Sequence, residues 1–154
     1  MTTNPIDRPR PDWVLVANAA RARCFERDPE DGTLHELADF VHPQSRMKAS
    51  ALDSDRAGHA FKGQASTQFE PRTEAQPKEH AAFAQEVAAF LEEAARVQRY
   101  GRLTLLASSA FLGMLRSHLA PLARALVQAS IALDLSACRG RELEDRVTKA
   151  IRAA

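Results

Sequence analysis

Short apolar or alternating segments open the chain and predict strands. The unbroken run 13–17 (WVLVA) is typical of a strand that is buried on both faces. Residues 20–27 alternate, with small apolar side chains on one side and arginines on the other, which predicts a half-exposed strand paired with the first. Turn residues at 29–32 (PEDG) separate it from a third strand at 34–41. We expect an antiparallel three-stranded meander.

The second half of the chain alternates helical and strand patterns. Residues 79–100 carry apolar side chains at steps of three and four, which predicts one amphipathic helix. A buried strand follows at 103–107, and then a helix capped by Ser108 or Ser109 whose apolar stripe is Phe111, Leu112, Leu115 and Leu119. The next helix has Pro121 in its first turn and carries Leu122 and Leu126. A strand at 130–135 precedes the last helix, which begins at about Arg141 and buries Leu143, Val147, Ala150 and Ile151.

This order, βββ, a long loop, then αβαβα, predicts an α/β fold. Strand–helix–strand units with short links favour parallel pairing through right-handed crossovers. Joined to the meander, they give a mixed five-stranded sheet flanked by helices, which is the arrangement of RNase H-like domains. We expect residues 12–154 to form this single domain and residues 1–11 to be a disordered tail.

The segment 42–78 has no regular periodicity. Loops this long are uncommon inside compact domains and are usually functional or disordered. Two interpretations remain open, namely a mobile loop with no function and a binding loop that becomes ordered on contact. It holds six Lys or Arg and four Asp or Glu, an excess too small to attract a polyanion by itself.

Composition and charge narrow the class of protein. Hydrophobic residues make up 45% of the chain, but 29 of them are alanine, so we expect a modest core. The formal net charge of +1 excludes binding driven by bulk charge. The polar, proline-rich start does not resemble a signal peptide, and no apolar run is long enough to span a membrane. Cys24 and Cys138 lie far apart without metal-ligand spacing, which suits two buried thiols. We expect a cytoplasmic protein that does not contact membranes.

The sequence shows no motif typical of a known class of enzyme. The strands at 13–17 and 103–107 carry no carboxylates for a two-metal nuclease, while Asp12 and Asp134 lie near strand ends. The pair Ser108-Ser109 lacks the glycines of a nucleophile elbow, and no two histidines share a helix face at zinc-ligand spacing. There is no P-loop and no GxGxxG. We therefore expect neither a cofactor nor a metal.

The ordered set of motifs resembles a bacterial family, the "protein required for attachment to host cells". The likeness runs from Trp13 to about Val147. It rests on five passages: WVLVA at 13–17 with ARAR at 20–23, SDRAG at 54–58 where the family usually has SDRPG, FA and VA at 83–84 and 87–88, LTLL at 103–106 with FLGMLR at 111–116, and DLS at 134–136 in place of DLT. Ala57 and the serines at 108–109 depart from the usual prolines.

The resemblance implies a relation to the central domain of archaeal and eukaryotic class-1 release factors. Those domains have an RNase H-like sheet and carry a Gly-Gly-Gln loop, in which the glutamine helps to position water against the peptidyl-tRNA ester. Lys62, Gly63 and Gln64 fall in the matching loop, with lysine in place of the first glycine. Gln64 is therefore the one catalytic candidate, and ester hydrolysis on the ribosome is the reaction that the analogy suggests. A chance match is the competing explanation.

Two functional hypotheses follow. The first is a non-catalytic, release-factor-like module that binds the ribosome or structured RNA in translation or rescue. Its contact loop would comprise Asp55, Arg56, Gly58, Lys62, Gly63 and Gln64. The second is a protein-interaction or regulatory module, either a homodimer or a binder of another protein, that affects host attachment indirectly. A positive face around the loop and around Arg21 and Arg23 would favour RNA, whereas an apolar patch would favour protein.

Overall fold

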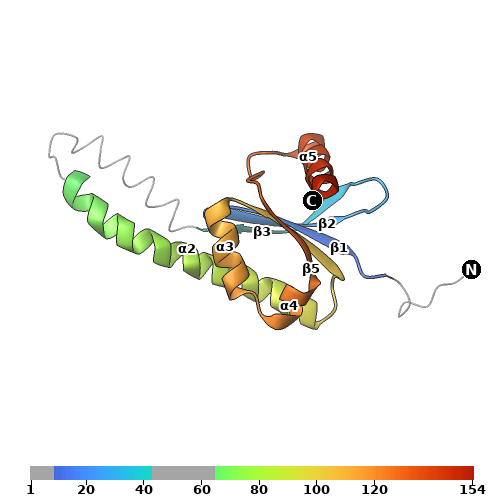
Figure 1. Cartoon of the computed structure of the whole chain (residues 1–154), viewed down its shortest axis with the longest axis horizontal. Coiled ribbons are helices and arrows are strands. Elements are labelled where there is room, and N and C mark those ends of the chain that lie inside the picture. The colour runs from blue at the N-terminus through green and yellow to red at the C-terminus, as the bar shows by residue number, and fades with distance from the viewer. Residues whose placement is uncertain (1–8, 43–64) are drawn as a thin grey trace, which may run out of the picture.

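The computed structural model describes residues 9–42 and 65–154, and its first three strands form the expected meander (Figure 1). Strands β1 (Asp12–Ala17), β2 (Arg21–Arg27) and β3 (Leu34–Val41) pair antiparallel in sequence order. Gly32 lies in the turn between β2 and β3 with a φ of +77°, a conformation that favours glycine. A Cβ there would also lie 2.8 Å from Oγ1 of Thr148, so the turn packs directly on the C-terminal helix.

The second half adds two parallel strands and four helices. These elements are α2 (Ala65–Arg96), β4 (Arg102–Ala107), α3 (Ser109–His118), α4 (Pro121–Leu126), β5 (Val127–Ala132) and α5 (Gly140–Ala153). The strand order is β3-β2-β1-β4-β5, and β4 pairs parallel with both β1 and β5. The expected α/β class with a mixed five-stranded sheet is therefore confirmed. The RNase H-like assignment is consistent with this order and stays a prediction.

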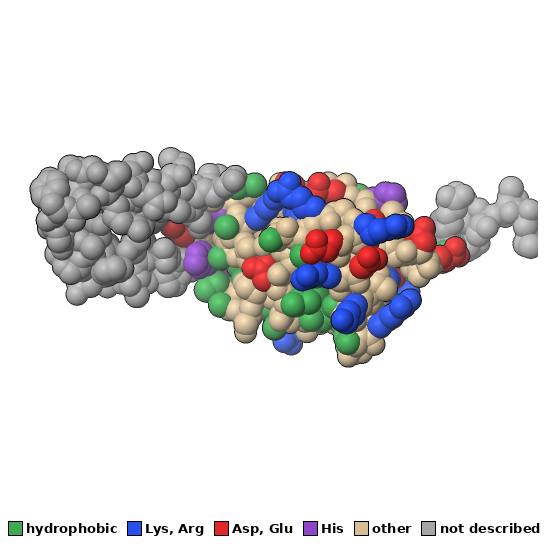
Figure 2. Space-filling view, turned by 90° about the horizontal axis from the view of Figure 1, so that it is seen from above, with side chains coloured by type: hydrophobic (Ala, Val, Ile, Leu, Met, Phe, Trp, Pro, Cys, Tyr) green, Lys and Arg blue, Asp and Glu red, His purple; other side chains and the backbone are tan. Residues whose placement is uncertain are grey.

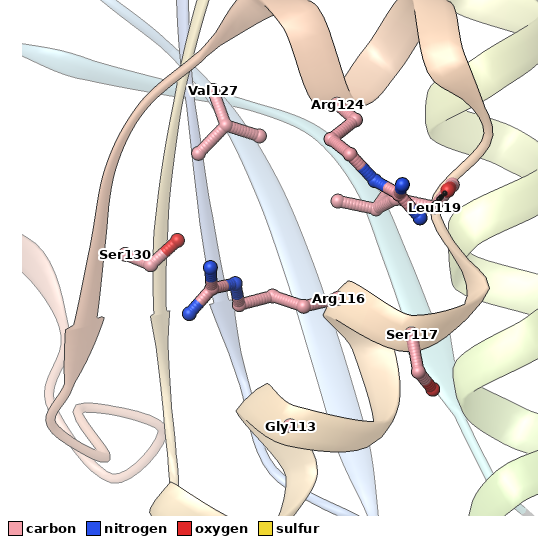
Figure 3. Close-up of a pocket in the computed structure, with 7 residues that line it drawn as sticks. All are labelled: Gly113, Arg116, Ser117, Leu119, Arg124, Val127 and Ser130. Carbon is pink, nitrogen blue, oxygen red and sulfur yellow. Dashed lines mark hydrogen bonds between the residues drawn. The ribbon is translucent and has the colours of Figure 1, made fainter.

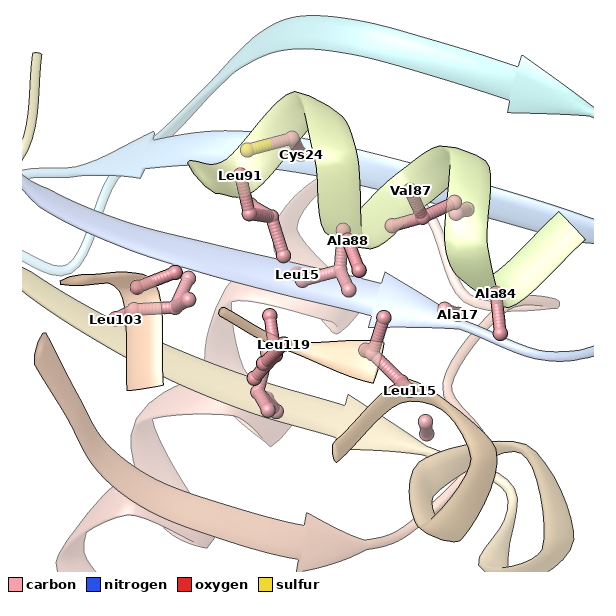
Figure 4. Close-up of a cluster of buried hydrophobic side chains, with 14 of the residues drawn as sticks. Leu15, Ala17, Cys24, Ala84, Val87, Ala88, Leu91, Leu103, Leu115 and Leu119 are labelled. Atoms are coloured by element: carbon pink, nitrogen blue, oxygen red, sulfur yellow. The ribbon is translucent and has the colours of Figure 1, made fainter. Parts of the chain in front are cut away.

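The larger core lies between the sheet and helices α2 and α3 (Figure 4). Alternate residues of the central strands, such as Leu15 and Leu105, point into it and are fully buried. Phe83, Val87 and Leu91 of α2 pack against them, as the helical periodicity predicts. Burial of each such side chain contributes about 1.5–3 kcal/mol, so this layer dominates the stability of the fold.

Helix α5 covers part of the opposite face of the sheet. Its residues Leu143 and Val147 are buried against Val14 and Val16 of β1 and against Phe25 of β2. In Figure 1, α5 accordingly lies over the β1–β2 side, away from α2 and α3. This second layer explains why residues of β1 are buried on both faces, as the apolar run predicts.

Three predicted details of β2, β5 and α4 are wrong. Strand β2 is mostly buried rather than half-exposed, because α5 and the segment before it cover the side that carries Arg23. The last strand is β5 at 127–132 rather than 130–135, and the leucines that continue the alternation lie in the following loop. Leu122 of α4 is 50% exposed, and the buried residue of that helix is Ala123.

Helix α2 begins at Ala65, whereas the periodicity predicted a start at Glu79. The predicted helix did not extend further toward the N-terminus because the residues before Glu79 include two prolines and lack apolar side chains at helical spacing, and proline disfavours a helix interior. Residues 1–8 of the predicted tail and 43–64 of the predicted loop lie outside the described residues. Within the described ranges, no helix combines the length and apolar character that a membrane span requires.

Candidate functional site

The residues predicted for the contact loop cannot be placed. Asp55, Arg56, Gly58, Lys62, Gly63 and Gln64 all lie outside the described residues. Their roles, including any catalytic role of Gln64, therefore stay predictions. The other part of the predicted positive face, formed by Arg21 and Arg23 on β2, is described and can be examined.

Arg21 is engaged in an ion pair rather than free. Its guanidinium donates two hydrogen bonds to Asp39 of β3, with N···O distances of 2.9 and 2.7 Å. These hydrogen bonds raise the pKa of Arg21 and lower the pKa of Asp39. The charges of Arg21 and Asp39 thus neutralise each other, and little positive charge is available to an external phosphate at this point.

Arg23 is buried and serves the fold. Its Nη2 donates to the carbonyl oxygens of Ser136 and Cys138 at 3.1 and 2.9 Å, and lies 3.5 Å from that of Leu135. Burial lowers its pKa, with the charge of Arg21 as the next contribution. Because these carbonyls belong to the segment between β5 and α5, Arg23 fixes that segment to the middle of β2. A positive face on β2, which would have favoured RNA as the partner, is therefore absent.

A polar cluster fixes the same segment to the end of β1. The amide nitrogen of Asn18 donates to Oγ of Ser136 at 2.8 Å and to Asp134 at 3.3 Å, while its oxygen accepts from the backbone N–H of Ala20 and Arg21. Burial opposes ionisation of Asp134, but hydrogen bonds from Ser136 and Asn18 outweigh it and lower the pKa. The motif residues 134–136 are thus explained by structure.

Two arginines line a pocket between α3, α4 and β5 (Figure 3). The pocket has a volume of about 560 Å³. Arg116 projects from α3 across it toward the side where Ser130 of β5 lies, and Arg124 enters from α4. Its seven lining residues are Gly113, Arg116, Ser117, Leu119, Arg124, Val127 and Ser130. None of them is acidic. The pocket therefore combines two cations with the hydroxyl group of Ser130, whereas the hydroxyl group of Ser117 donates to the carbonyl oxygen of Met114 at 2.8 Å.

The two arginines differ in how they are held. Nη2 of Arg124 donates to the carbonyl oxygen of Leu119 at 2.8 Å, which orients the guanidinium while its other N–H groups remain available. Arg116 is exposed and has no hydrogen-bond or ion-pair partner among the described residues. Gly113 borders open space, since a Cβ at this position would meet no atom within 4 Å. The site can accept an anion without breaking an existing ion pair.

The residues that line the pocket carry charge of one sign only. From Leu103 to Leu133 the sequence contains Arg116, Arg124 and no aspartate or glutamate. A nearby carboxylate, that of Glu92 on α2, accepts a hydrogen bond from the backbone N–H of Ala123 at 2.9 Å. The face that carries α5 differs, because acidic and basic side chains are interspersed over it (Figure 2). The region α3–α4–β5 is therefore the described surface best suited to an anionic partner.

Sequence reasoning missed this pocket. Arg116 and Gly113 were identified only as part of the run FLGMLR, and Arg124 was not singled out. The available signal was the acid-free stretch 103–133 with two arginines eight positions apart. Spacing alone could not reveal that they line one pocket, because they lie on different helices.

The described residues contain no arrangement typical of a metal nuclease. Asp12 lies at the start of β1 and pairs with Arg102 at 3.1 Å, whereas Asp134 follows β5 at the other end of the sheet. Within residues 9–42 and 78–154, whose side chains the structure describes, no group of three or more His, Cys, Asp or Glu could hold a metal ion. Ser108 is the N-cap of α3 as expected, although its side chain makes no capping hydrogen bond.

Comparison with known proteins assigns the chain to a family. A family model described as "Protein required for attachment to host cells" matches residues 13–147. The comparison with curated proteins finds no match. The matched region begins in β1 and ends in α5, so it includes every strand of the sheet and the arginine pocket. The chain belongs to the family of proteins required for attachment to host cells.

Proposed function

We propose that this family member is a non-catalytic RNA-binding module that holds phosphates in the arginine pocket between α3, α4 and β5. It would act in the cytoplasm as a release-factor-like partner of the ribosome or of structured RNA. The observation that carries the proposal is that Arg116 and Arg124 line the same hollow, which has no acidic lining residue. Arginine is the side chain best suited to bidentate contact with phosphate.

The roles of the family motifs support this choice of site. Arg23 and the residues 134–136 are accounted for by hydrogen bonds that hold the chain together. In contrast, Arg116 makes no such contact with any residue that the structure describes. Gly113 occupies a helix position where alanine would fit and would favour the helix by about 0.5–1 kcal/mol. Motif residues that do nothing for the fold are candidates for contact with a partner.

The pocket accounts for phosphate contacts but not for sequence recognition. Two arginines and Ser130 can bind phosphate and ribose oxygens, which position RNA without reading its bases. Such contacts suit a partner recognised by shape, such as a folded RNA or a ribosomal RNA surface. The predicted loop residues Arg56 and Lys62 would add further phosphate contacts.

Co-sedimentation with ribosomes through a sucrose gradient tests the proposal. We expect the protein to move into the ribosomal fractions at low salt and to leave them at moderate salt. The variant Arg116→Ala/Arg124→Ala should stay at the top of the gradient. The matched control Arg141→Ala/Arg152→Ala removes two exposed arginines from α5 and should sediment like the wild type.

Three outcomes are informative. Equal loss in both double variants would mean that binding depends on net charge and would remove the pocket from the account. Loss only in Arg56→Ala/Lys62→Ala would place the contact in the loop instead. Wild-type protein that stays at the top at both salt concentrations would rule out the ribosome as the partner, and a folded RNA would be tested next.

A further inference from the structure

Strand β5 is an open edge of the sheet. It pairs with β4 on one side and, among the described residues, with no strand on the other. Its sequence at 127–132, VQASIA, contains no charged residue and no proline. A register shift at its start leaves the regular stretch 129–132 along the edge. Natural edge strands usually carry charges, prolines or bulges that prevent further pairing. Strand β5 has neither charge nor proline, and its register shift lies at its start, outside residues 129–132.

The opposite edge shows what such protection looks like. Strand β3 carries His35, Glu36 and Asp39, and the register shift opposite Cys24 and Phe25 leaves Leu37 as an extra residue. Charges and a bulge in the middle of the strand oppose pairing with another chain. The contrast indicates that the lack of protection on β5 is specific to that edge.

An apolar groove runs beside β5 on the face that α5 covers only in part. Its volume is about 610 Å³, and it separates β5 and the following loop from the C-terminal half of α5. Ile131 and Leu133 line one side, while Ala150 and Ala153 line the other. Leu133 is 39% exposed. The arginine pocket lies on the other face of the sheet, where Val127 and Ser130 point, so the two hollows are separate.

The charges at the groove favour an acidic occupant. Arg146 and Lys149 are its charged lining residues, and no lining residue is acidic. Arg146 lies 3.4 Å from Glu142, whereas Lys149 has no ion-pair partner among the described residues. A second copy that paired through its own β5 would bring Arg146 and Lys149 of the two copies together, so like charges would repel. A second copy that offered its β3 would present the bulge and the charges described above, which oppose pairing. A different, acidic chain fits better.

We propose that β5 and this groove bind an extended segment of a partner protein as a sixth strand. Because side chains alternate along a strand, one set would lie in the groove and should be aliphatic. The intervening or terminal positions near Lys149 should carry carboxylates. The site is independent of the RNA-binding pocket, so the module could hold an RNA and a protein at the same time.

A synthetic peptide of about nine residues in which valine alternates with glutamate provides the probe. Fluorescence anisotropy should show saturable binding, and amide hydrogen exchange should slow at 129–132. A peptide of the same composition with its valines grouped together should bind more weakly by at least about fivefold, as should one with a central proline, because each loses strand pairing or groove contacts. Lysine in place of glutamate should weaken binding similarly.

Variants of exposed residues locate the site without disturbing the fold. Lys149→Glu and Leu133→Ser should each weaken peptide binding by about fivefold or more, whereas Leu122→Ser, an exposed leucine on α4, should leave it unchanged. Arg116→Ala/Arg124→Ala should also bind the peptide normally, which separates this inference from the proposed function. Equal binding of the three valine–glutamate peptides, or no protection of β5, would overturn the proposal. A free protein that is already dimeric through β5 and dissociates in Leu133→Ser would overturn it as well.

Discussion

Replacing Arg23 by methionine tests how the segment before α5 is held. Methionine keeps a long apolar stem that can pack under the segment but removes the guanidinium. The carbonyl oxygens of Ser136 and Cys138 then lose their donor, which in the wild type lies 3.1 and 2.9 Å away. The segment also carries Leu135, a buried residue of the α5 layer, so its loosening should destabilise the whole layer.

The expected cost follows from the contacts. Two hydrogen bonds from a charged donor contribute about 1.5–3 kcal/mol each, while the third contact, at 3.5 Å, adds little. Removing the buried cation also removes its desolvation penalty, which offsets part of this loss. We expect Arg23→Met to lower the free energy of unfolding by about 2–3 kcal/mol. Arg21→Met breaks an ion pair that is about one third exposed, at 32% and 36% for its two side chains, and should cost about 0.2–1 kcal/mol.

Urea denaturation followed by circular dichroism measures both values. Hydrogen exchange should also accelerate at 135–138 in Arg23→Met and remain unchanged in Arg21→Met. Equal costs for the two variants would refute the reasoning, because they would show that burial of Arg23 confers no special role. An unchanged or raised free energy of unfolding in Arg23→Met would mean that desolvation outweighs the hydrogen bonds.

Three further predictions concern stability and reactivity. At pH 8 a thiol reagent should label Cys138 in the native protein but not Cys24, whose burial raises its pKa to about 12, and mass spectrometry distinguishes the two. The pKa of Asp39 is lowered in the folded state, so the ionised carboxylate stabilises the fold above about pH 4, and this stabilisation is lost as the pH falls through the folded pKa. Asp39→Asn should therefore reduce the difference in the free energy of unfolding between pH 7 and pH 3. Tyr100→Phe removes the hydrogen bond from the phenol to the carbonyl oxygen of Leu91 at 2.8 Å and should cost about 1 kcal/mol in urea denaturation.

Much of the fold could be predicted because its elements carry strong local patterns. The bounds of β3 and the buried stripe of α3 agree with the structure, since alternation and three-to-four spacing directly reflect burial on one side. The position of β5 could not be predicted in the same way. Its own residues are small and partly exposed, whereas Leu133 and Leu135 beyond it continue the alternation, so the pattern pointed three residues too far along the chain.

The candidate site was harder to predict than the fold. Arg23 was expected on an exposed face because alternation in a strand shows two sides without showing what covers each. Its partners at 135–138 are more than a hundred positions away, and only the tertiary structure brings them together. Arg116 and Arg124 likewise belong to two helices whose relative placement is set by packing on α2 and the sheet.

The most direct test of the account is the salt dependence of binding to a fluorescent RNA hairpin. Each phosphate contact contributes about 0.7–0.9 to the slope of log K against log salt concentration. If Arg116 and Arg124 each contact a phosphate, Arg116→Ala/Arg124→Ala should weaken binding and reduce the slope by about 1.4–1.8, while Arg141→Ala/Arg152→Ala should match the wild type. An unchanged slope in Arg116→Ala/Arg124→Ala would contradict the assignment of the pocket as the phosphate-binding site.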